Sequence, residues 1–295
     1  MPEQILIPRR PLYAPHLPPV FANMNRAGSV GKTTHKVTMW TLAAQRGYRG
    51  LIVDADLQSD ASYWFGYDGD HVPDGEATVH DVMLGRAKLS DAIVPARTRV
   101  AAGESDDAFE DVPGLFLVRG DKAMKQADGE LVQDAKGVFW LQMAFKRGIE
   151  EGQFDFIGVD CPASLGRLSV SLLVASTEVM VCMKPTRKEL RGARALAQEI
   201  AEVRAGYEDF DASPEASLFV MNEAKEHDSQ GKFYKGIQDE AREMFGDRLM
   251  PMVKGSVLVP EAYDAQEPLP YWAPQSPLLT TYGQILDRIG FPATT

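Results

Sequence analysis

The chain has few of the residues that hold secreted or metal-binding proteins together. Its 295 residues include 2 cysteines and 5 histidines, and the histidines do not have the spacing of a metal site. Cys161 and Cys182 lie in or just after apolar, strand-like runs, so we expect both to be reduced packing residues of a cytosolic protein. One disulfide between them is the alternative. The composition therefore argues against a disulfide scaffold and against a zinc-bound domain.

Long apolar runs and an excess of positive charge are also missing. No run approaches the roughly 18 apolar residues that a membrane-spanning helix requires. The start of the chain, Met1-Pro2-Glu3-Gln4, has no signal-peptide pattern. The formal net charge is −11, which is the wrong sign for a protein that coats nucleic acid through its overall charge. We therefore expect no membrane span, and any contact with DNA would need a local basic patch.

A glycine-rich turn is the most informative feature that is present. Residues 28–34 read G-S-V-G-K-T-T, directly after an apolar run at residues 20–22 and before a helical pattern expected over residues 33–46. Such a turn between a strand and a helix aims backbone N–H groups and the positive end of the helix at one point, which makes a phosphate site. Lys32 would supply a mobile cation and Thr33 a hydroxyl for Mg²⁺.

Acidic residues follow two later strand-like runs. Asp54 and Asp56 come directly after residues 51–53, and Asp160 comes directly after residues 154–159. In an open parallel α/β sheet, ligands bind at the carboxyl ends of the strands, so these carboxylates would lie beside the phosphates. Three such carboxylates, in order behind a phosphate loop, favour hydrolysis of a nucleoside triphosphate.

In order and spacing, these motifs resemble those of the ParA/MinD family of dimeric P-loop ATPases, and within it the ParA partition proteins. Residues 25–34 resemble the family loop K-G-G-x-G-K-T-T, often preceded by Asn. Residues 54–62, D-A-D-L-Q-S-D-A-S, resemble D-x-D-P-Q-G-N-A-S, and residues 160–166 resemble D-x-P-P-s-l-G. Further similar stretches extend the resemblance over about residues 20–290.

The resemblance implies ATP and Mg²⁺ as cofactors and a role for each matching residue. Lys32 and Asp56 would be catalytic, with Asp56 positioning the attacking water. Mg²⁺ would be held by Thr33, Asp54 and Asp160, partly through its waters. The implied nucleotide-binding residues are Ala27, Gly28, Ser29, Val30, Gly31, Lys32, Thr33, Thr34 and Asn222. Asn222 falls where the family often places an Asn that contacts adenine, and a plain turn residue is the alternative.

Position 27 departs from the family pattern. The family's second lysine, which reaches the partner's nucleotide across the dimer, falls at Ala27. Either another cation replaces it, with Arg26, Lys122 and Lys125 as candidates, or the contact across the dimer is weaker. Ser29 also replaces a loop glycine, and we expect this to be tolerated only if its φ stays negative. Because the carboxylates remain, we still expect an active ATPase.

The resemblance further implies a homodimer that hydrolyses ATP slowly and drives the partitioning of plasmid or chromosomal DNA. Its partners would be nonspecific DNA and a ParB-like centromere-binding or cargo adaptor protein, and its location cytoplasmic and nucleoid-associated. Candidate basic segments are residues 184–204, with a local charge of +3, and residues 222–256, with a local charge of −1.

Two other functions stay open. Family members that lack the second lysine are associated with positioning protein cargo, such as carboxysomes, over the nucleoid. A relative of the nitrogenase iron protein would instead need a pair of cluster cysteines on the dimer face. Cys161 and Cys182 do not suit that arrangement, because one would lie at a strand end and the other inside a strand.

The order of the motifs predicts an α/β fold with a doubly wound, mostly parallel sheet that helices flank on both faces, as in P-loop NTPases. Residues 1–19 hold six prolines and would form an extended N-terminal arm, with residues 20–295 as a single ParA-like ATPase domain. A closing helix expected over residues 278–289 is not a basic amphipathic tail, which argues against the membrane-anchored MinD branch.

Other elements are expected from periodicity and composition. We expect an amphipathic helix over residues 138–149 and surface loops at residues 66–75 and 101–114. Strands are expected near residues 116–118, 154–159, 179–183, 217–221 and 250–253.

Overall fold

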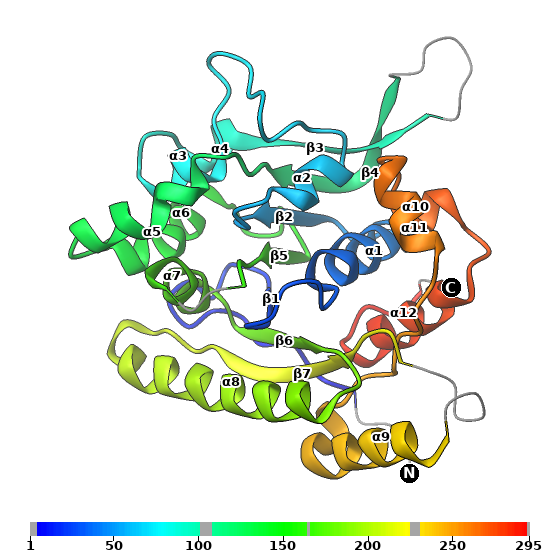
Figure 1. Ribbon diagram of the computed structural model, residues 1–295. Coiled ribbons are helices and arrows are strands. Elements are labelled where there is room, and N and C mark those ends of the chain that lie inside the picture. Colours follow the sequence, from blue (N-terminus) through cyan, green and yellow to red (C-terminus); the bar gives the residue numbers. More distant parts are fainter. Residues whose placement is uncertain (1–4, 101–107, 164–165, 225–230, 294–295) are drawn as a thin grey trace.

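One sheet organises the molecule. The computed structural model describes residues 5–100, 108–163, 166–224 and 231–293 (Figure 1). Within these residues, seven strands form a sheet in the order β3-β4-β2-β5-β1-β6-β7. The strands are β1 (Val20–Met24), β2 (Gly50–Asp54), β3 (Ile93–Arg99), β4 (Phe109–Val118), β5 (Phe156–Asp160), β6 (Glu178–Met183) and β7 (Glu215–Met221). All neighbouring pairs are parallel except β3 with β4, so the predicted doubly wound, mostly parallel sheet is confirmed.

Helices cover both faces of this sheet. Side chains of α5, α6, α7, α8 and α9 share one hydrophobic cluster, and side chains of α1, α10, α11 and α12 share the other. Figure 1 shows α5 to α7 on one side of the central strands, and α1 with α12 on the other. The helices are α1 (Lys32–Gln45), α2 (Asp60–Trp64), α3 (Val79–Met83), α4 (Leu89–Ala92), α5 (Met124–Gln133), α6 (Trp140–Gly148), α7 (Arg167–Ala175), α8 (Arg187–Gly206), α9 (Gly231–Phe245), α10 (Leu258–Asp264), α11 (Leu269–Trp272) and α12 (Pro277–Arg288).

The central strands β1, β2, β5 and β6 have no exposed residue. Continuous burial is expected for parallel strands that helices cover on both faces. Packing there is tight enough to require glycine: a Cβ at Gly158 would lie 2.7 Å from Nε1 of Trp40. Trp40 itself stacks on Phe156 with 4.0 Å between ring centroids. These contacts fix α1, and therefore its N-terminus, against the sheet.

The expected helices are found close to their predicted bounds, whereas two expectations about the sheet are wrong. Residues 249–254 run beside β7 with isolated bridges at Leu249 and Lys254, and they do not form the strand expected near residues 250–253. Residues 109–114, expected to be a loop, form the first part of β4, where they pair with β3. Charged and polar side chains alternate with buried ones in this ribbon, so its apolar signal is weak. Residues 101–107 of the same expected loop lie outside the described residues.

The described part of the N-terminal arm lies against the sheet. Residues 5–19 contain no helix or strand, yet Leu17 is fully buried and the Tyr13 hydroxyl donates a hydrogen bond to the carbonyl oxygen of Ala175 at 2.8 Å. Arg9 pairs with the buried carboxylate of Glu178 at 2.9 Å. The division of the chain into an arm and a single domain stays a prediction. In the described part of the chain, no helix has the length and apolar character to cross a membrane.

Candidate nucleotide-binding site

The glycine-rich turn joins the end of β1 to the start of α1. Gly31 is the N-cap of α1 and has a φ of 92°, in the left-handed region that favours glycine. A Cβ at this position would lie 2.2 Å from Nδ2 of Asn222. Asn222 follows β7 and donates a hydrogen bond from Nδ2 to the carbonyl oxygen of Val30 at 3.1 Å. The turn is therefore held by a residue 192 positions farther along the chain.

Ser29 contradicts the expectation of a negative φ. Its φ is 56°, so a residue with a Cβ occupies the left-handed region. This conformation costs a non-glycine residue about 1–2 kcal/mol, and residues held in it are concentrated at functional sites. Gly28, by contrast, has open space around its Cβ position, so the protein itself does not require glycine there.

Two carboxylates meet beneath the turn because β2 and β5 are neighbours. Asp54 and Asp160 are paired in the strand register, and both are fully buried. Oδ2 of Asp160 accepts a hydrogen bond from the Thr33 hydroxyl at 2.8 Å. Oδ1 of Asp160 has no hydrogen-bond partner among the described residues. A hydroxyl and a carboxylate with an unused oxygen are ligands that suit Mg²⁺ or its waters.

The predicted metal set is only partly brought together. Asp54 accepts hydrogen bonds at Oδ2 from the backbone N–H and the hydroxyl of Ser62, at 2.7 and 2.6 Å. One of its oxygens is therefore engaged by α2, whereas Thr33 and Asp160 contact each other directly. This geometry suits Asp54 to a position behind the residues that would contact the metal, and suits it less to direct ligation of the metal.

Burial controls the ionisation of this pair. Burial first, and then the neighbouring charge of Asp160, together raise the pKa of Asp54 to about 8. Burial also raises the pKa of Asp160, to about 6, although the nearby cation of Lys36 opposes the shift. Both carboxyl groups thus hold their protons more strongly than exposed aspartates, and a bound cation would favour their ionised forms.

Asp56 lies beside the turn, on the segment after β2. A cavity of about 400 Å³ is lined by the turn and by Thr33, Thr34, Asp56, Leu57, Gln58, Asp60, Pro162 and Ala163. Oδ1 of Asp56 accepts a hydrogen bond from the backbone N–H of Gln58 at 3.0 Å. Burial raises the pKa of Asp56, and the charge of Lys32 opposes that shift. This cavity therefore has the residue types that are needed to bind the triphosphate group of a nucleotide.

A second cavity, of about 830 Å³, also borders the turn and shares Ser29, Gly31 and Thr34 with the first. Its wall includes Asn222 and Tyr282, together with residues 253–256. A larger, partly apolar hollow next to a phosphate site is the arrangement that a nucleoside needs. Of the predicted nucleotide-binding residues, 28–34 and Asn222 line one or both of these cavities, whereas Ala27 lines neither.

Several polar residues of the site were missed by sequence reasoning. Buried Asn23 donates a hydrogen bond to the carbonyl oxygen of Lys32, and Asn25 accepts one from the backbone N–H of Ala27 at 2.9 Å. His35 contacts the Tyr282 hydroxyl at 2.8 Å, and burial lowers its pKa to about 4. Lys36 is fully buried. Only Asn25 had a sequence signal, its place before the family loop.

The candidates for the cation missing at Ala27 lie in different surroundings. Arg26 forms an ion pair with Glu199 of α8 in its own chain. Lys122 donates a hydrogen bond to the carbonyl oxygen of Asp70 at 3.3 Å, and it lines a small hollow with Lys125 next to residues 57–60. The lysines are therefore nearer to the segment after Asp56 than to the turn.

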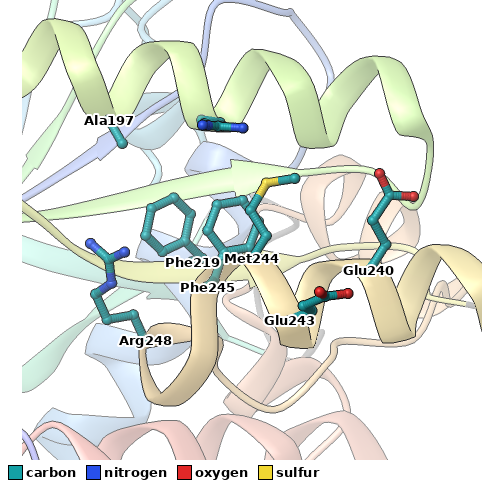
Figure 2. A pocket seen from close by; sticks show the side chains of 8 residues that line it. Ala197, Phe219, Glu240, Glu243, Met244, Phe245 and Arg248 are labelled. Atoms are coloured by element: carbon teal, nitrogen blue, oxygen red, sulfur yellow. The ribbon is translucent and has the colours of Figure 1, made fainter.

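Another hollow, of about 500 Å³, lies between α8 and α9 and contains none of the motif residues (Figure 2). The rings of Phe219 and Phe245 stack there at 4.0 Å, and the rim carries charges of both signs. Nearby, Arg187, which belongs to the predicted basic segment at residues 184–204, pairs with Glu240 of α9 at 3.2 Å. Cys161 and Cys182 are both buried and free, as expected.

Comparison with known proteins agrees with this geometry. A family model described as an AAA domain matches residues 19–211, more than half of the chain. The chain belongs to the ParA/MinD family of P-loop ATPases. It is similar to the chromosome partitioning protein ParA of Caulobacter vibrioides, with 27% identity over 85% of both chains. It is also similar to the sporulation initiation inhibitor protein Soj of Bacillus subtilis, with 28% identity over 87% of this chain and 92% of Soj.

Solved structures of the family share the fold. A substituted form of Cyanothece McdA in complex with ATP has a TM-score of 0.74 at 19% identity, over 94% of this chain and 98% of that one. The septum site-determining protein MinD of Pyrococcus horikoshii, complexed with Mg-ADP, has a TM-score of 0.63 at 18% identity, over 90% and 93% of the two chains. Members of this ParA/MinD family are ATPases, and family structures hold ATP or ADP, in some cases with magnesium.

Proposed function

We propose that this protein is a Mg²⁺-dependent ATPase that acts as a dimeric switch in the partitioning of plasmid or chromosomal DNA. The observation that carries the proposal is the Thr33–Asp160 contact beneath a glycine-rich turn, with an unused carboxylate oxygen beside it. Partition proteins among the similar chains support the cellular role. Turnover would be slow and stimulated by a partner, because a switch needs a long-lived ATP state.

Each site residue has a role in this proposal. The backbone N–H groups of residues 28–31 and the ammonium of Lys32 would hold the phosphates, and Thr34 would contribute at the start of α1. Thr33 and Asp160 would hold Mg²⁺, with Asp54 behind them. Asp56 would orient the attacking water from its place in the smaller cavity. Asn222 would stand beside the base, and Mg²⁺ would offset charge on the phosphates.

The partners in this proposal are a second copy of the chain, nonspecific DNA and a ParB-like adaptor, in a cytoplasmic, nucleoid-associated location. The basic segment at residues 184–204 supports local DNA binding despite the net charge of −11. In this reading residues 20–295 act as one ATPase domain, with residues 1–19 as an arm packed on it.

A second role, the positioning of a protein cargo over the nucleoid, is favoured by one observation: residue 27 is an alanine. A methyl group cannot neutralise a phosphate across a dimer, so in this chain the contact that the family's second lysine makes is either supplied by another cation or weaker. The two roles differ in the partner. Purifying the product of the adjacent gene and testing whether it binds a DNA site or a protein assembly distinguishes them.

The ATPase proposal is tested by Lys32→Ala. Losing the cation at the phosphates should weaken ATP binding by at least about 100-fold, because charge-assisted contacts to phosphate are strong. ATP-dependent dimerisation should disappear. Calorimetry and size-exclusion chromatography with and without Mg²⁺–ATP measure both. Dimerisation with ATP at wild-type affinity would contradict the proposal.

The role of Asp56 is tested by Asp56→Ala. This variant should bind ATP, remain dimeric and lose at least about 100-fold in turnover, since a water-orienting residue contributes about that much to a rate. Single-turnover hydrolysis and the lifetime of the ATP dimer are the measurements. Asp60→Ala, which changes another carboxylate of the same cavity, is the matched control. Wild-type turnover in Asp56→Ala would assign the water to another group.

A further inference from the structure

A large hollow, which we call the α3–α6 groove, lies where α3, α4 and α6 contact one another (Figure 1). Its volume is about 910 Å³. Its lining residues are 82–91, Lys136, Trp140, Met143, Ala144, Arg147 and Gly148. Among the described residues, none lines both this groove and a cavity beside the phosphate turn. The groove is therefore separate from the nucleotide site.

Part of the groove is apolar. Met83 and Leu89 are buried in its wall, whereas the side chains of Leu84, Trp140 and Met143 are partly exposed. Hollows of about 300–1,000 Å³ with such a lining are typical of sites that bind ligands. Apolar side chains that are partly exposed around one hollow can bury further area against a partner, and such surfaces often mark interaction sites.

The rim of the groove is basic, although the whole chain has a net charge of −11. Among the described residues that line it, one is acidic, Asp91, and four are exposed cations: Arg86, Lys88, Lys136 and Arg147. Arg86 pairs with Glu130 at 3.2 Å. No described residue forms an ion pair with the other three cations. The groove is thus a local reversal of the sign of the protein's charge.

The hollow between α8 and α9 provides a contrast. Its wall carries two glutamates, Glu240 and Glu243, and two arginines, Arg194 and Arg248, so its charges balance (Figure 2). A balanced rim does not select a partner by charge. Three cations without an internal counter-ion favour an anionic partner, because complementary charge steers encounter and suppresses wrong partners.

We propose that the α3–α6 groove docks an acidic, amphipathic segment of a partner protein. Apolar side chains of the segment enter the hollow, and its carboxylates lie against Lys88, Lys136 and Arg147. DNA would offer phosphates to these cations and would leave the apolar lining uncovered. A two-fold contact between two copies of the groove would set cations against cations. The inference goes beyond the proposed function and does not depend on it.

The experiment selects ligands of the full-length chain from a random library of short peptides displayed on phage. Selected peptides should combine acidic with large apolar residues. Their affinity should fall at least about tenfold in Arg147→Glu, because the substitution turns an attraction into a repulsion. Lys146→Glu is the matched control: Lys146 is also exposed in the last turn of α6 and does not line the groove, so this variant should bind within about twofold of the wild type.

Met143→Ala tests the apolar part of the groove. It should weaken binding of a selected peptide by about five- to tenfold, as expected from the apolar area that no longer becomes buried. Fluorescence anisotropy of a labelled peptide measures the affinity, and melting temperatures show whether each variant is folded. If Met143→Ala does not fold, Met143→Gln takes its place, since it keeps the side-chain length and adds a polar amide.

A selection that yields no peptide sensitive to Arg147→Glu would overturn the inference, as would equal losses of affinity in Arg147→Glu and Lys146→Glu. Binding to a short DNA duplex and to vesicles of anionic lipid is measured with the same variants. A loss there in Arg147→Glu, with peptide binding unchanged, would assign the cations to nucleic acid or to a membrane surface. A dimer that Arg147→Glu abolishes in sedimentation, again with peptide binding unchanged, would assign the groove to a second copy of the chain.

Discussion

Two regions of this protein bury charge, and they do so in opposite ways. In the β3–β4 ribbon, the guanidinium of Arg97 lies over the ring of Tyr67, 3.7 Å from its centroid, and directly after β4, Arg119 pairs with Glu76 at 2.6 Å. At the carboxyl ends of the central strands, Asp54 and Asp160 face each other, and the charge of one raises the pKa of the other. The ribbon places cations on rings and carboxylates, whereas the central site sets two buried carboxylates side by side, and the cations of Lys36 and Lys32 only partly oppose the rise in the pKa of Asp160.

This difference separates a structural charge from a functional one. An arginine with a ring and a carboxylate beside it stabilises the folded chain without any ligand. Two buried carboxylates destabilise it, and such an arrangement is expected where a ligand cation completes it. The positive φ of Ser29 is likewise an unfavourable feature that is expected at a functional site. Three substitutions would test the distinction.

Gly31→Ala should have the largest effect. Its Cβ would meet the Asn222 side chain and the residue would be held at a φ of 92°. We expect a loss of about 3 kcal/mol in the free energy of unfolding, from backbone strain and the lost Asn222–Val30 hydrogen bond, together with loss of nucleotide binding. Chemical denaturation and calorimetry with ADP are the measurements. Gly28→Ala is the control, and a loss of stability as large as that of Gly31→Ala would contradict this reading.

Asp54→Asn should change how stability depends on pH. A carboxyl group whose pKa is higher in the folded chain keeps its proton there and loses it in the unfolded chain. Its stabilising effect is therefore present at low pH and is lost as the pH rises toward the folded pKa of about 8. Between pH 6 and pH 8, the nucleotide-free wild type should lose about 2 kcal/mol relative to Asp54→Asn.

Denaturation at several pH values without Mg²⁺ measures this difference, and Asp91→Asn, at an exposed position, serves as the control. Parallel pH profiles of the wild type and Asp54→Asn would show that Asp54 titrates alike in the folded and unfolded chains.

Arg97→Met should have the smallest effect and should leave the site unchanged. It removes the cation over Tyr67 and a hydrogen bond to the carbonyl oxygen of Gly66 at 3.0 Å. We expect a loss of about 1 kcal/mol in the free energy of unfolding, with less than about a twofold change in ADP affinity. A large change in affinity would mean that the ribbon and the nucleotide site are coupled, and the comparison between them would fail.

Much of the fold was predictable because its signals are local. The buried parallel strands read as continuous apolar runs, and α1 begins where the glycine-rich turn ends. The spacing of Val138, Leu141 and Phe145 correctly predicted α6. The β3–β4 ribbon was missed because it lies at the edge of the sheet, where exposed side chains alternate with buried ones. The strand expected near residues 250–253 was wrong because apolar character alone does not create a continuous ladder of hydrogen bonds with a neighbouring strand.

The sequence by itself determined the class of the site. The sequence shows a glycine-rich turn that ends in Lys32 and Thr33, and then Asp54 and Asp160 directly after apolar runs. Each of these motifs consists of residues that are neighbours in the chain, so it can be recognised from the sequence. The tertiary structure decided which groups meet. The neighbouring strands β2 and β5 set Asp54 against Asp160, and the order β1-β6-β7 brought Asn222, which follows β7, to Val30. The packing of α1 on the sheet placed Lys36 against the carbonyl oxygen of Val159 on β5. These contacts join residues more than a hundred positions apart, and no local periodicity records such pairing.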